Sequence, residues 1–371
     1  MDVERILAAT QDIITPVAVV DKEIVERNLA RMAKLAADNN VKLRPHAKTH
    51  KSAYMAQRQM AHGAVGLTCA TFTEAEVFAD AGVDDLLIAH PPVGRPKLER
   101  LAALASRIKR LAVSLDDVGV ARSLPERVEV LWEVDTGQHR IGTLPGEPTA
   151  EGVRELVKAI GAGRFRGLIT HAGFVYAATN REERQRAADQ ESDGLLMTAE
   201  LLRRDGIAVR ELSVGSTPTA GLALRGGITE MRPGTYTYGD ANQVTLGSQA
   251  LEDCALAVVA TVVATPAPDR AVADAGSKAI SADLRVAGLD GYGMVLGRSE
   301  LTVARLSEEH AVLTASVRTG LSIDDRLAIV PSHACTVVNL HPQILLMGTS
   351  AARWLKVDAR GWHPVAKTET S

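Results

Sequence analysis

The feature that most limits the fold of this chain is a regular alternation of short apolar runs and amphipathic stretches between Thr15 and about Ala241. Between the runs lie segments whose apolar residues recur at helical spacing, such as KEIVERNLARMAKLAADNN and TAEGVRELVKAIGAG. Nine runs have the length and composition of strands: TPVAVVD, VKLRP, AVGLTCAT, DDLLIAH, RLAVSLDD, VEVLWEVD, FRGLITHAG, RELSVGS and EMRPGTY. Such an α/β pattern predicts parallel strands joined by right-handed crossovers, and eight such units close a TIM-type (β/α)₈ barrel.

The texture of the sequence changes after Leu251. The runs CALAVVATVVATPAP, SELTVARLSEEHAVLTASV and DDRLAIVPSHACTVVNL are rich in β-branched residues, are separated by Pro, Gly and Asp, and have little helical periodicity. We therefore predict a barrel over residues 16–250 and a C-terminal antiparallel β-domain over residues 251–371. TPVAVVD is either the first barrel strand or a strand shared with the second domain.

Composition excludes several classes of protein. The formal charge is −3 and no basic stripe is present, so nucleic acid is not an expected partner. No apolar run reaches the roughly 20 residues that span a bilayer, and the charged start MDVERILAATQDI does not resemble a signal peptide. Three scattered cysteines do not form a disulfide framework. We expect a cytoplasmic protein that does not enter a membrane.

The segment RPHAKTHKS follows the second predicted strand and places Lys48 between His46 and His50. In an extended chain alternate side chains point the same way, so all three would face the carboxyl end of the barrel, where such folds carry their chemistry. Neighbouring cations and partial burial would favour a neutral Lys48 amine, which can attack an aldehyde. The spacing fits a solvated lysine at a strand end equally well.

Two other strand ends carry polar groups. In VGSTPTAG, the residues Gly215, Ser216 and Thr217 can aim backbone N–H groups and hydroxyls at a phosphate, although a plain Ser-Thr-Pro turn has the same sequence. In GLITHAGFVY, His171 and Tyr176 could lie against a planar heterocycle, and a buried, hydrogen-bonded histidine is the alternative for His171.

Taken in order, RPHAKTHKS, EVDTGQHRIG, THAGFVY, VGSTPT, MRPGTYTYGD and PSHAC resemble the D-threonine aldolase and D-serine dehydratase family, relatives of alanine racemase that use pyridoxal 5'-phosphate (PLP). The resemblance covers nearly the whole chain. It implies a PLP-binding barrel, a β-domain that includes residues 1–15, and a head-to-tail homodimer.

By matching position, the resemblance makes Lys48 the lysine that binds PLP covalently. Gly215, Ser216 and Thr217, with Tyr236 of MRPGTYTYGD, would hold its phosphate. Tyr176 matches the phenol that faces the pyridine nitrogen in D-serine dehydratases, where alanine racemases have an arginine. Arg140 of DTGQHRIG would contact the phenolic oxygen of PLP or a carboxylate, or would form an ion pair at a strand end.

The motif PSHAC adds a metal to this expectation. His333 and Cys335 would point the same way from an extended chain, and an imidazole with a thiolate prefers Zn²⁺, with Mn²⁺ or Mg²⁺ as alternatives. Taken alone, the pattern also fits a buried cysteine beside a strand histidine. In the family His-x-Cys resembles the dehydratases, and His-x-Asp the aldolases.

These residues predict a lyase for β-hydroxy D-amino acids. In the leading hypothesis Lys48, with His46 and His50 beside it, removes the Cα proton, a metal polarises the β-hydroxyl, and a keto acid and ammonia result. The alternatives are retro-aldol cleavage to glycine and an aldehyde, racemisation with Tyr292 of LDGYGMV as a second base, and a non-catalytic PLP carrier.

Overall fold

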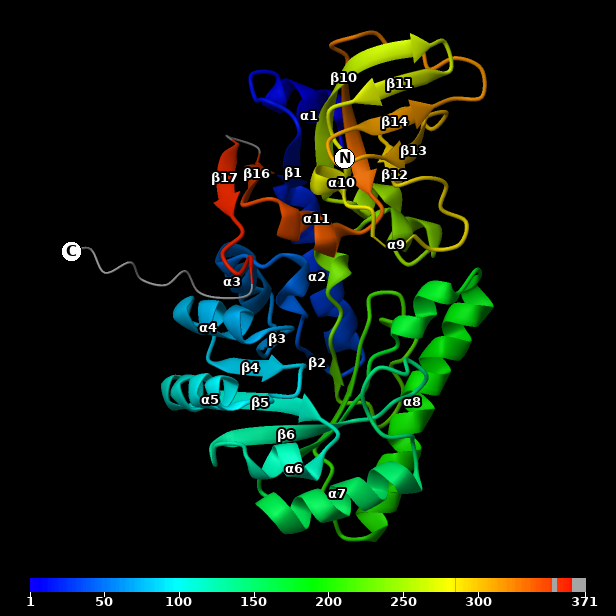
Figure 1. Ribbon diagram of the computed structural model, residues 1–371. Coiled ribbons are helices and arrows are strands. Elements are labelled where there is room, and N and C mark those ends of the chain that lie inside the picture. Colours follow the sequence, from blue (N-terminus) through cyan, green and yellow to red (C-terminus); the bar gives the residue numbers. More distant parts are fainter. Residues whose placement is uncertain (284, 349–351, 362–371) are drawn as a thin grey trace, which may run out of the picture.

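Two domains, one with parallel and one with antiparallel strands, form the part of the chain that the computed structural model describes, residues 1–283, 285–348 and 352–361 (Figure 1). The parallel domain lies below the antiparallel one in this view, and helix α2 (Lys22–Asp38) runs from the upper domain along the lower one. No helix among these residues is long and apolar enough to cross a membrane.

Eight strands form the parallel sheet in the order β2-β9-β8-β7-β6-β5-β4-β3, and every neighbouring pair is parallel. A parallel bridge between His46 and Thr68 joins β2 to β3 and closes the barrel. The strands are β2 Lys42–Leu43, β3 Leu67–Cys69, β4 Asp85–Ile88, β5 Arg110–Leu115, β6 Val128–Glu133, β7 Phe165–Ile169, β8 Glu211–Val214 and β9 Glu230–Met231. They match eight of the nine predicted runs in the predicted order, so the TIM-type barrel is confirmed.

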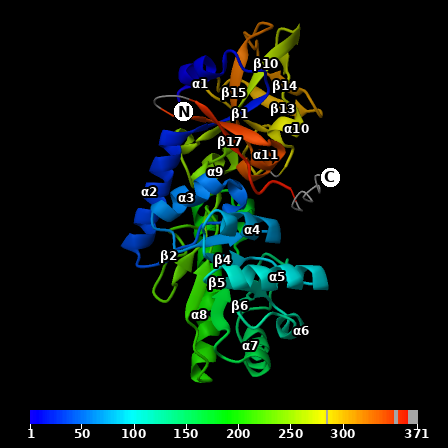
Figure 2. The ribbon, with the colours of Figure 1, turned by 90° about the vertical axis from the view of Figure 1, so that its left-hand side faces the viewer.

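Helices cover the outside of this barrel (Figures 1 and 2). Short connections are possible because polar residues at strand ends cap the following helices: Asp21 accepts from the N–H of Ile24, and Thr71 from that of Glu74. In α2 the buried residues Ile24, Val25, Leu29 and Met32 recur at the helical period. The other helices are α3 Ala53–Ala61, α4 Phe72–Asp80, α5 Arg95–Arg107, α6 Val118–Arg122, α7 Glu147–Ile160 and α8 Arg181–Arg204.

The inside of the barrel is filled in layers, because inward residues alternate along each strand. At the amino ends lies a layer of ion pairs, here called the charged layer, which consists of Arg44, Asp85, Arg110, Glu129, Arg166, Glu211 and Glu230. Above it is a small apolar cluster of Leu87, Ala112, Leu131 and Ile169. The charged layer and this cluster close the bottom of the barrel, and the carboxyl ends of the strands remain open for a site.

The side chains at the centre of the charged layer are almost completely buried. Arg44 donates to Glu230 over 2.8 Å and to Asp85 over 2.7 Å, and its side chain is 2% exposed. The carboxylate of Glu211, 1% exposed, accepts from Arg110 over 2.9 Å and from Arg166 over 2.7 Å. Each buried charge therefore has at least one partner of opposite sign.

Nine strands form the second domain, and a second barrel closes within it. The sheet order is β11-β14-β13-β12-β15-β10-β1-β16-β17, and an additional pairing of β10 with β11 closes the first six strands. The bounds are β1 Val17–Asp21, β10 Leu256–Ala267, β11 Arg270–Ala273, β12 Gly293–Val295, β13 Thr302–Leu306, β14 Ala311–Thr314, β15 Arg326–Pro331, β16 Gln343–Met347 and β17 Arg353–Lys356. The helices here are α1 Val3–Thr10, α9 Ala241–Thr245, α10 Ser277–Ile280 and α11 Ala334–Leu340.

The first strand corrects the predicted boundary at residue 16. TPVAVVD forms β1, which pairs antiparallel with β10 and parallel with β16, so it lies in the sheet of the second domain. All five residues of β1 are buried, as expected for a strand with neighbours on both sides and packing on both faces. The predicted range 251–371 includes residues 284, 349–351 and 362–371, which lie outside the described part of the chain.

Candidate active site

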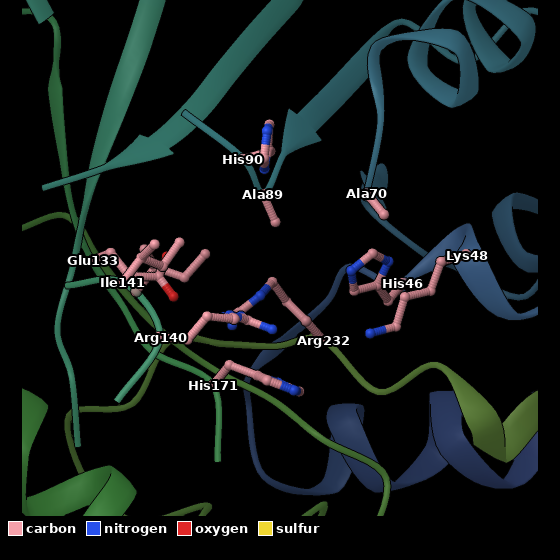
Figure 3. Close-up of a pocket in the computed structure, with 11 residues that line it drawn as sticks. His46, Lys48, Ala70, Ala89, His90, Glu133, Arg140, Ile141, His171 and Arg232 are labelled. Atoms are coloured by element: carbon pink, nitrogen blue, oxygen red, sulfur yellow. The ribbon is translucent and has the colours of Figure 1, made fainter. Parts of the chain in front are cut away.

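A cavity of about 300 Å³ lies at the carboxyl ends of the barrel strands (Figure 3). Parallel barrels carry binding sites at this end because the loops that follow the strands converge there. The lining residues come from the ends of six strands: His46, Lys48, Ala70, Ala89, His90, Glu133, Arg140, Ile141, Ile169, His171 and Arg232. Lys48, His46, Arg140 and His171, four of the residues predicted from sequence, therefore surround one space.

Lys48 does not lie on an extended strand as predicted. His46 is extended, but Ala47–Thr49 form a 3₁₀ turn, η1, and the chain leaves the turn through Lys51 with a φ of +48°. The turn packs against the loop after β9, where a Cβ on Gly234 would lie 2.9 Å from the Thr49 hydroxyl. His46 and Lys48 still line the cavity (Figure 3).

His50 was predicted to share the face of Lys48, and this geometry is wrong. Its ring is fully buried away from the cavity, where Nε2 bonds to the Gln59 side-chain oxygen over 3.1 Å and Nδ1 accepts from the N–H of Ser52 over 3.1 Å. The 3₁₀ turn breaks the two-residue alternation that the prediction assumed. In this structure His50 fixes the turn against α3.

Two of the three cavity histidines, His46 and His171, are neutral. Burial, with Lys48 and Arg140 nearby, lowers the pKa of His171 to about 3. Its Nδ1–H donates to the carbonyl of Gly215 over 2.7 Å, so the lone pair of Nε2 is left for a ligand. Burial and then Lys48 hold the pKa of His46 well below its usual range, and among the described residues its Nδ1 has no hydrogen-bond partner.

Three polar lining residues were missed by the sequence reasoning. Arg232, in the motif MRPGTYTYGD, donates to the Ser213 hydroxyl over 2.6 Å and to the carbonyls of Val214 and Thr170, so its guanidinium is fixed. Burial, against the opposing effect of Arg232, raises the pKa of Glu133 to about 7. His90 lies two residues beyond the end of β4. Glu133 is the last residue of β6, and Arg232 directly follows β9. A place at or just beyond the end of a strand is the signal that could have identified all three.

The predicted phosphate loop follows β8, but Gly215 has a different role from the one expected. Its N–H donates to Glu191 over 2.7 Å, and a Cβ on it would lie 2.9 Å from that of Arg232. Gly215 therefore allows close packing and offers no free N–H. Within the described part of the chain, the backbone N–H groups of Ser216 and Thr217 have no hydrogen-bond acceptor. These two groups suit an anion.

Thr217 and Tyr236 meet, as the resemblance implies. The Thr217 hydroxyl accepts from the N–H of Tyr236 over 3.0 Å. The Tyr236 ring is buried, and its hydroxyl accepts from the Gln59 side chain over 3.3 Å. Tyr236 thus holds the loop at Thr217 through its backbone N–H.

Tyr176 lies toward the second domain. It belongs to a short 3₁₀ helix, η2 (Gly173–Ala177), and its hydroxyl accepts from the side chain of Gln243 over 3.1 Å. Its ring packs against the apolar cluster of the β-domain, and burial raises its pKa above the usual range. The side chain is not among those that line the cavity.

His333 and Cys335 were predicted to project from an extended chain, which is also wrong. Only His333 is extended, and α11 begins at Ala334, whose N–H donates to the Asp240 carboxylate over 3.0 Å. The side chains nevertheless meet. His333 is largely buried, and despite that burial the nearby Cys335 thiolate and Asp283 raise its pKa to about 11. Burial opposes the ionisation of Cys335, but His333 and then Lys48 lower its pKa below the usual range.

The arrangement of this pair fits a metal ion. His333 Nδ1 donates to the Asp283 carboxylate over 2.6 Å, which leaves Nε2 as the ligand atom, and carboxylates orient metal-binding histidines in this way. Cys335 supplies a sulfur that ionises readily. No group of three or more donors that could hold a metal occurs among residues 1–283, 285–348 and 352–361. A metal here would have two protein ligands and open positions for water or substrate.

The pair belongs to the same site as Lys48. The Thr49 hydroxyl, next to Lys48, lies 3.1 Å from Cys335 Sγ, and the Thr235 hydroxyl lies 3.8 Å from it. Lys48 thus lies between the barrel cavity on one side and the His333–Cys335 pair on the other.

Comparisons with known proteins agree with this geometry. The alanine racemase N-terminal domain matches residues 20–242, and a putative serine dehydratase domain matches residues 255–347. The chain is similar to D-threo-3-hydroxyaspartate dehydratase of Delftia sp. (strain HT23), with 35% identity over 94% of this chain and 98% of that protein. It is also similar to D-threonine aldolase of Arthrobacter sp., with 33% identity over 94% and 93%.

Solved structures agree as well. The Delftia dehydratase aligns with a TM-score of 0.85 at 32% identity, over 95% of this chain and 98% of that one. D-threonine aldolase from Filomicrobium marinum aligns with a TM-score of 0.84 at 33% identity, over 94% and 96%. Two structures of D-threo-3-hydroxyaspartate dehydratase mutants, similar to this chain as well, replace a histidine and, in the metal-free form, a cysteine two residues later.

Proposed function

Because the chain belongs to the family of D-threonine aldolases and D-serine dehydratases built on an alanine racemase-type barrel, we propose that it is a PLP- and metal-dependent lyase for β-hydroxy D-amino acids. The reaction we assign is dehydration, as in D-serine and D-threo-3-hydroxyaspartate dehydratases. Loss of the β-hydroxyl and hydrolysis of the resulting enamine give a keto acid and ammonia.

One observation carries this proposal. The turn with Lys48 and the helix with Cys335 come from different domains, yet Thr49 Oγ1 and Cys335 Sγ are 3.1 Å apart. An amine that can act as a base and a metal-binding thiolate are therefore available to the same small molecule. Proton removal at Cα and departure of a hydroxyl from Cβ require a base and a Lewis acid that reach neighbouring carbons of one substrate.

The residues present fit PLP. Lys48 would hold it covalently, and the free N–H groups of Ser216 and Thr217, with Tyr236 behind them, would hold its phosphate. When bound, PLP supplies a conjugated ring that withdraws electrons from the substrate's Cα. Lys48, once the substrate's amine has displaced it from the cofactor, would accept the Cα proton at Nζ as a free amine. His171 lines the cavity with a neutral acceptor at Nε2. The uncharged phenol of Tyr176, which lies beyond this lining toward the second domain, would be the partner of the pyridine nitrogen.

The charge of the cavity lining favours anionic ligands. Lys48, Arg140 and Arg232 line the space, and the one acidic lining residue, Glu133, has a pKa raised to about 7 by burial. The site therefore attracts anions, as an amino-acid carboxylate and a phosphorylated cofactor require. Arg140, at the rim, is positioned for the carboxylate or for the phenolic oxygen of PLP.

The residues also fit a divalent metal, held by His333 Nε2 and Cys335 Sγ, with Asp283 fixing the imidazole. When bound, the metal supplies a Lewis acid for the β-hydroxyl. A nitrogen and sulfur pair favours Zn²⁺ over Mn²⁺ or Mg²⁺. The histidine and cysteine replaced in the mutant structures of D-threo-3-hydroxyaspartate dehydratase have the spacing of His333 and Cys335, which supports this assignment.

The test is to incubate the holoenzyme with D-serine, D-threonine and D-threo-3-hydroxyaspartate and to assay ammonia, keto acid and glycine together. We expect equal amounts of ammonia and keto acid, and no turnover after removal of the metal with EDTA. Full activity in metal-free enzyme would refute the metal's role. We also propose that the protein is a cytoplasmic homodimer that binds neither nucleic acid nor membrane. Sedimentation tests the dimer, and cell fractionation tests the location.

D-threonine aldolase activity is the second candidate, since an enzyme of that name from Arthrobacter is 33% identical. Glycine and an aldehyde without ammonia would establish it. Racemisation would require Tyr292 as a second base. The centre of the Tyr292 ring lies 4.4 Å from the guanidinium carbon of Arg285, and the side chain does not line the cavity of its own chain. No turnover of any substrate would favour the PLP carrier.

A further inference from the structure

Lys51 ends the turn that carries Lys48, and nothing in the proposed reaction uses it. It has a φ of +48°, which side-chain-bearing residues rarely adopt, so the chain turns sharply there. The side chain is 13% exposed. A lysine held in a strained conformation and mostly buried needs compensating contacts.

Those contacts reach two other elements. Lys51 Nζ donates to the side-chain oxygen of Asn339 over 2.9 Å, and it lies 3.4 Å from Glu74 Oε1. Asn339 is on α11, and Glu74 is in the first turn of α4. The backbone carbonyl of Lys51 accepts from the N–H of Ala359 over 2.9 Å.

Glu74 is 0% exposed, and it links Lys51 to the cavity wall. Its second oxygen accepts from the N–H of Ala70 over 2.6 Å, and Ala70 lines the cavity. Burial raises the pKa of Glu74, and Lys51 opposes that effect. Among the described residues, no hydrogen-bond donor reaches Glu74 Oε1, so the Lys51 ammonium is its compensating charge.

Asn339 is four residues after Cys335, so the two side chains lie on the same face of α11. The segment 47–51, which carries Lys48 and ends at Lys51, is here called the lysine turn. The helix is attached to it at two points: Thr49 to Cys335 over 3.1 Å and Lys51 to Asn339 over 2.9 Å. One point would allow the helix to pivot. Two points one helical turn apart fix both its distance and its direction.

We infer that Lys51, with Glu74 and Asn339, is a positioning residue that holds α11 against the lysine turn and thereby sets the place of Cys335 and His333 relative to Lys48. This inference rests on the proposed function. Lys51 touches neither reacting group and acts only through the two elements it joins.

The test compares Lys51→Met, which keeps most of the side-chain length, with Lys51→Arg, which keeps the charge. Lys278→Met is the control, because Lys278 is 57% exposed and pairs only with Glu308 and Glu309 on the surface. The readouts are the metal retained against graded EDTA, the thiolate charge-transfer band of the Co²⁺-loaded protein, PLP content, and kcat and KM.

We expect Lys51→Met to lose half its metal at about tenfold lower EDTA and to lower kcat about tenfold, as removal of groups that orient metal ligands commonly does. PLP content and KM should change less than about twofold, since only uniform substrate binding would move KM. Lys51→Arg should restore most of the loss, and Lys278→Met should match the natural protein. Of these three variants, only Lys51→Met should show a shift of the cobalt charge-transfer band.

Asn339→Leu provides a second route if Lys51→Met does not fold. It should repeat the loss of metal affinity, and the double variant should be no worse than the poorer single one, because both remove the same contact. Unchanged metal affinity and cobalt spectrum in these variants would overturn the inference while leaving the proposed function intact. A natural protein that binds no metal would overturn both.

Discussion

Replacement of Glu211 by glutamine tests whether the charged layer stabilises the barrel. Glu211 is 1% exposed and accepts from both Arg110 and Arg166. Glutamine keeps the shape and removes the charge. Arg110 keeps Glu129 and Asp85 as partners, so the variant loses one carboxylate from a network that otherwise stays connected.

The magnitude follows from the carboxylate's pKa. Burial opposes ionisation, but Arg110 and Arg166 outweigh it and lower the pKa of Glu211 from 4.5 to about 2. At about 1.4 kcal/mol per pKa unit, the charged form contributes on the order of 3 kcal/mol to the free energy of unfolding at pH 7. Breaking a buried ion pair in other proteins costs about 3–5 kcal/mol, so the two figures agree.

The sign of the pH dependence is fixed by the direction of this shift. Because the folded pKa lies below the unfolded one, the contribution is complete above about pH 4.5 and disappears as the pH falls through 2. The gap between the natural protein and Glu211→Gln should therefore narrow to on the order of 1 kcal/mol at pH 3.

Urea unfolding followed by circular dichroism at pH 7 and pH 3 measures this gap. Glu147→Gln is the matched control: Glu147 pairs with Arg154 but is 64% exposed, so its replacement should cost less than about 1 kcal/mol. A gap below that of the control at pH 7, or one that stays constant to pH 3, would refute the assigned role of Glu211.

Three further predictions concern the site. Lys48→Ala should lower kcat by about 10³-fold or more, because the base at Cα is lost, and single-turnover product assays would detect any surviving chemistry. Cys335→Ala should abolish metal binding measured by elemental analysis while PLP content persists; retention of one metal per chain would argue against the His333–Cys335 site. His50→Leu should cost about 1–3 kcal/mol of stability through the lost bonds to Gln59 and Ser52 and leave the pH profile of kcat in place. A changed profile in a stable His50→Leu variant would restore His50 as a catalytic candidate.

The fold could be predicted from the sequence because the two periodicities are local. Each barrel strand is a short apolar run between turn residues, and α2 and α7 follow the helical period closely. The place of β1 could not be predicted in this way, because a strand buried on both faces reads the same in either sheet. Its partners, β10 and β16, decide the matter, and they lie far along the chain.

The site was predictable only where a strand end coincided with a chemically distinctive residue. Lys48 and His171 were found in this way, while Arg232 and Glu133 lay in quoted motifs without being singled out. The two errors of geometry, at His50 and at Cys335, have one cause. In both motifs a helical turn begins within the motif itself, so a spacing of two residues no longer means a shared face.

The pairing of β1 also bears on the order in which the protein assembles during synthesis. Val17 and Val19 leave the ribosome first, yet the strands that flank them contain Val259 and Leu345. This valine-rich strand therefore stays unpaired in the nascent chain while the entire parallel barrel is synthesised. The candidate site between the two domains can therefore form only near the end of translation. A truncated product would have a complete parallel barrel attached to a strand β1 without partners, which would tend to aggregate.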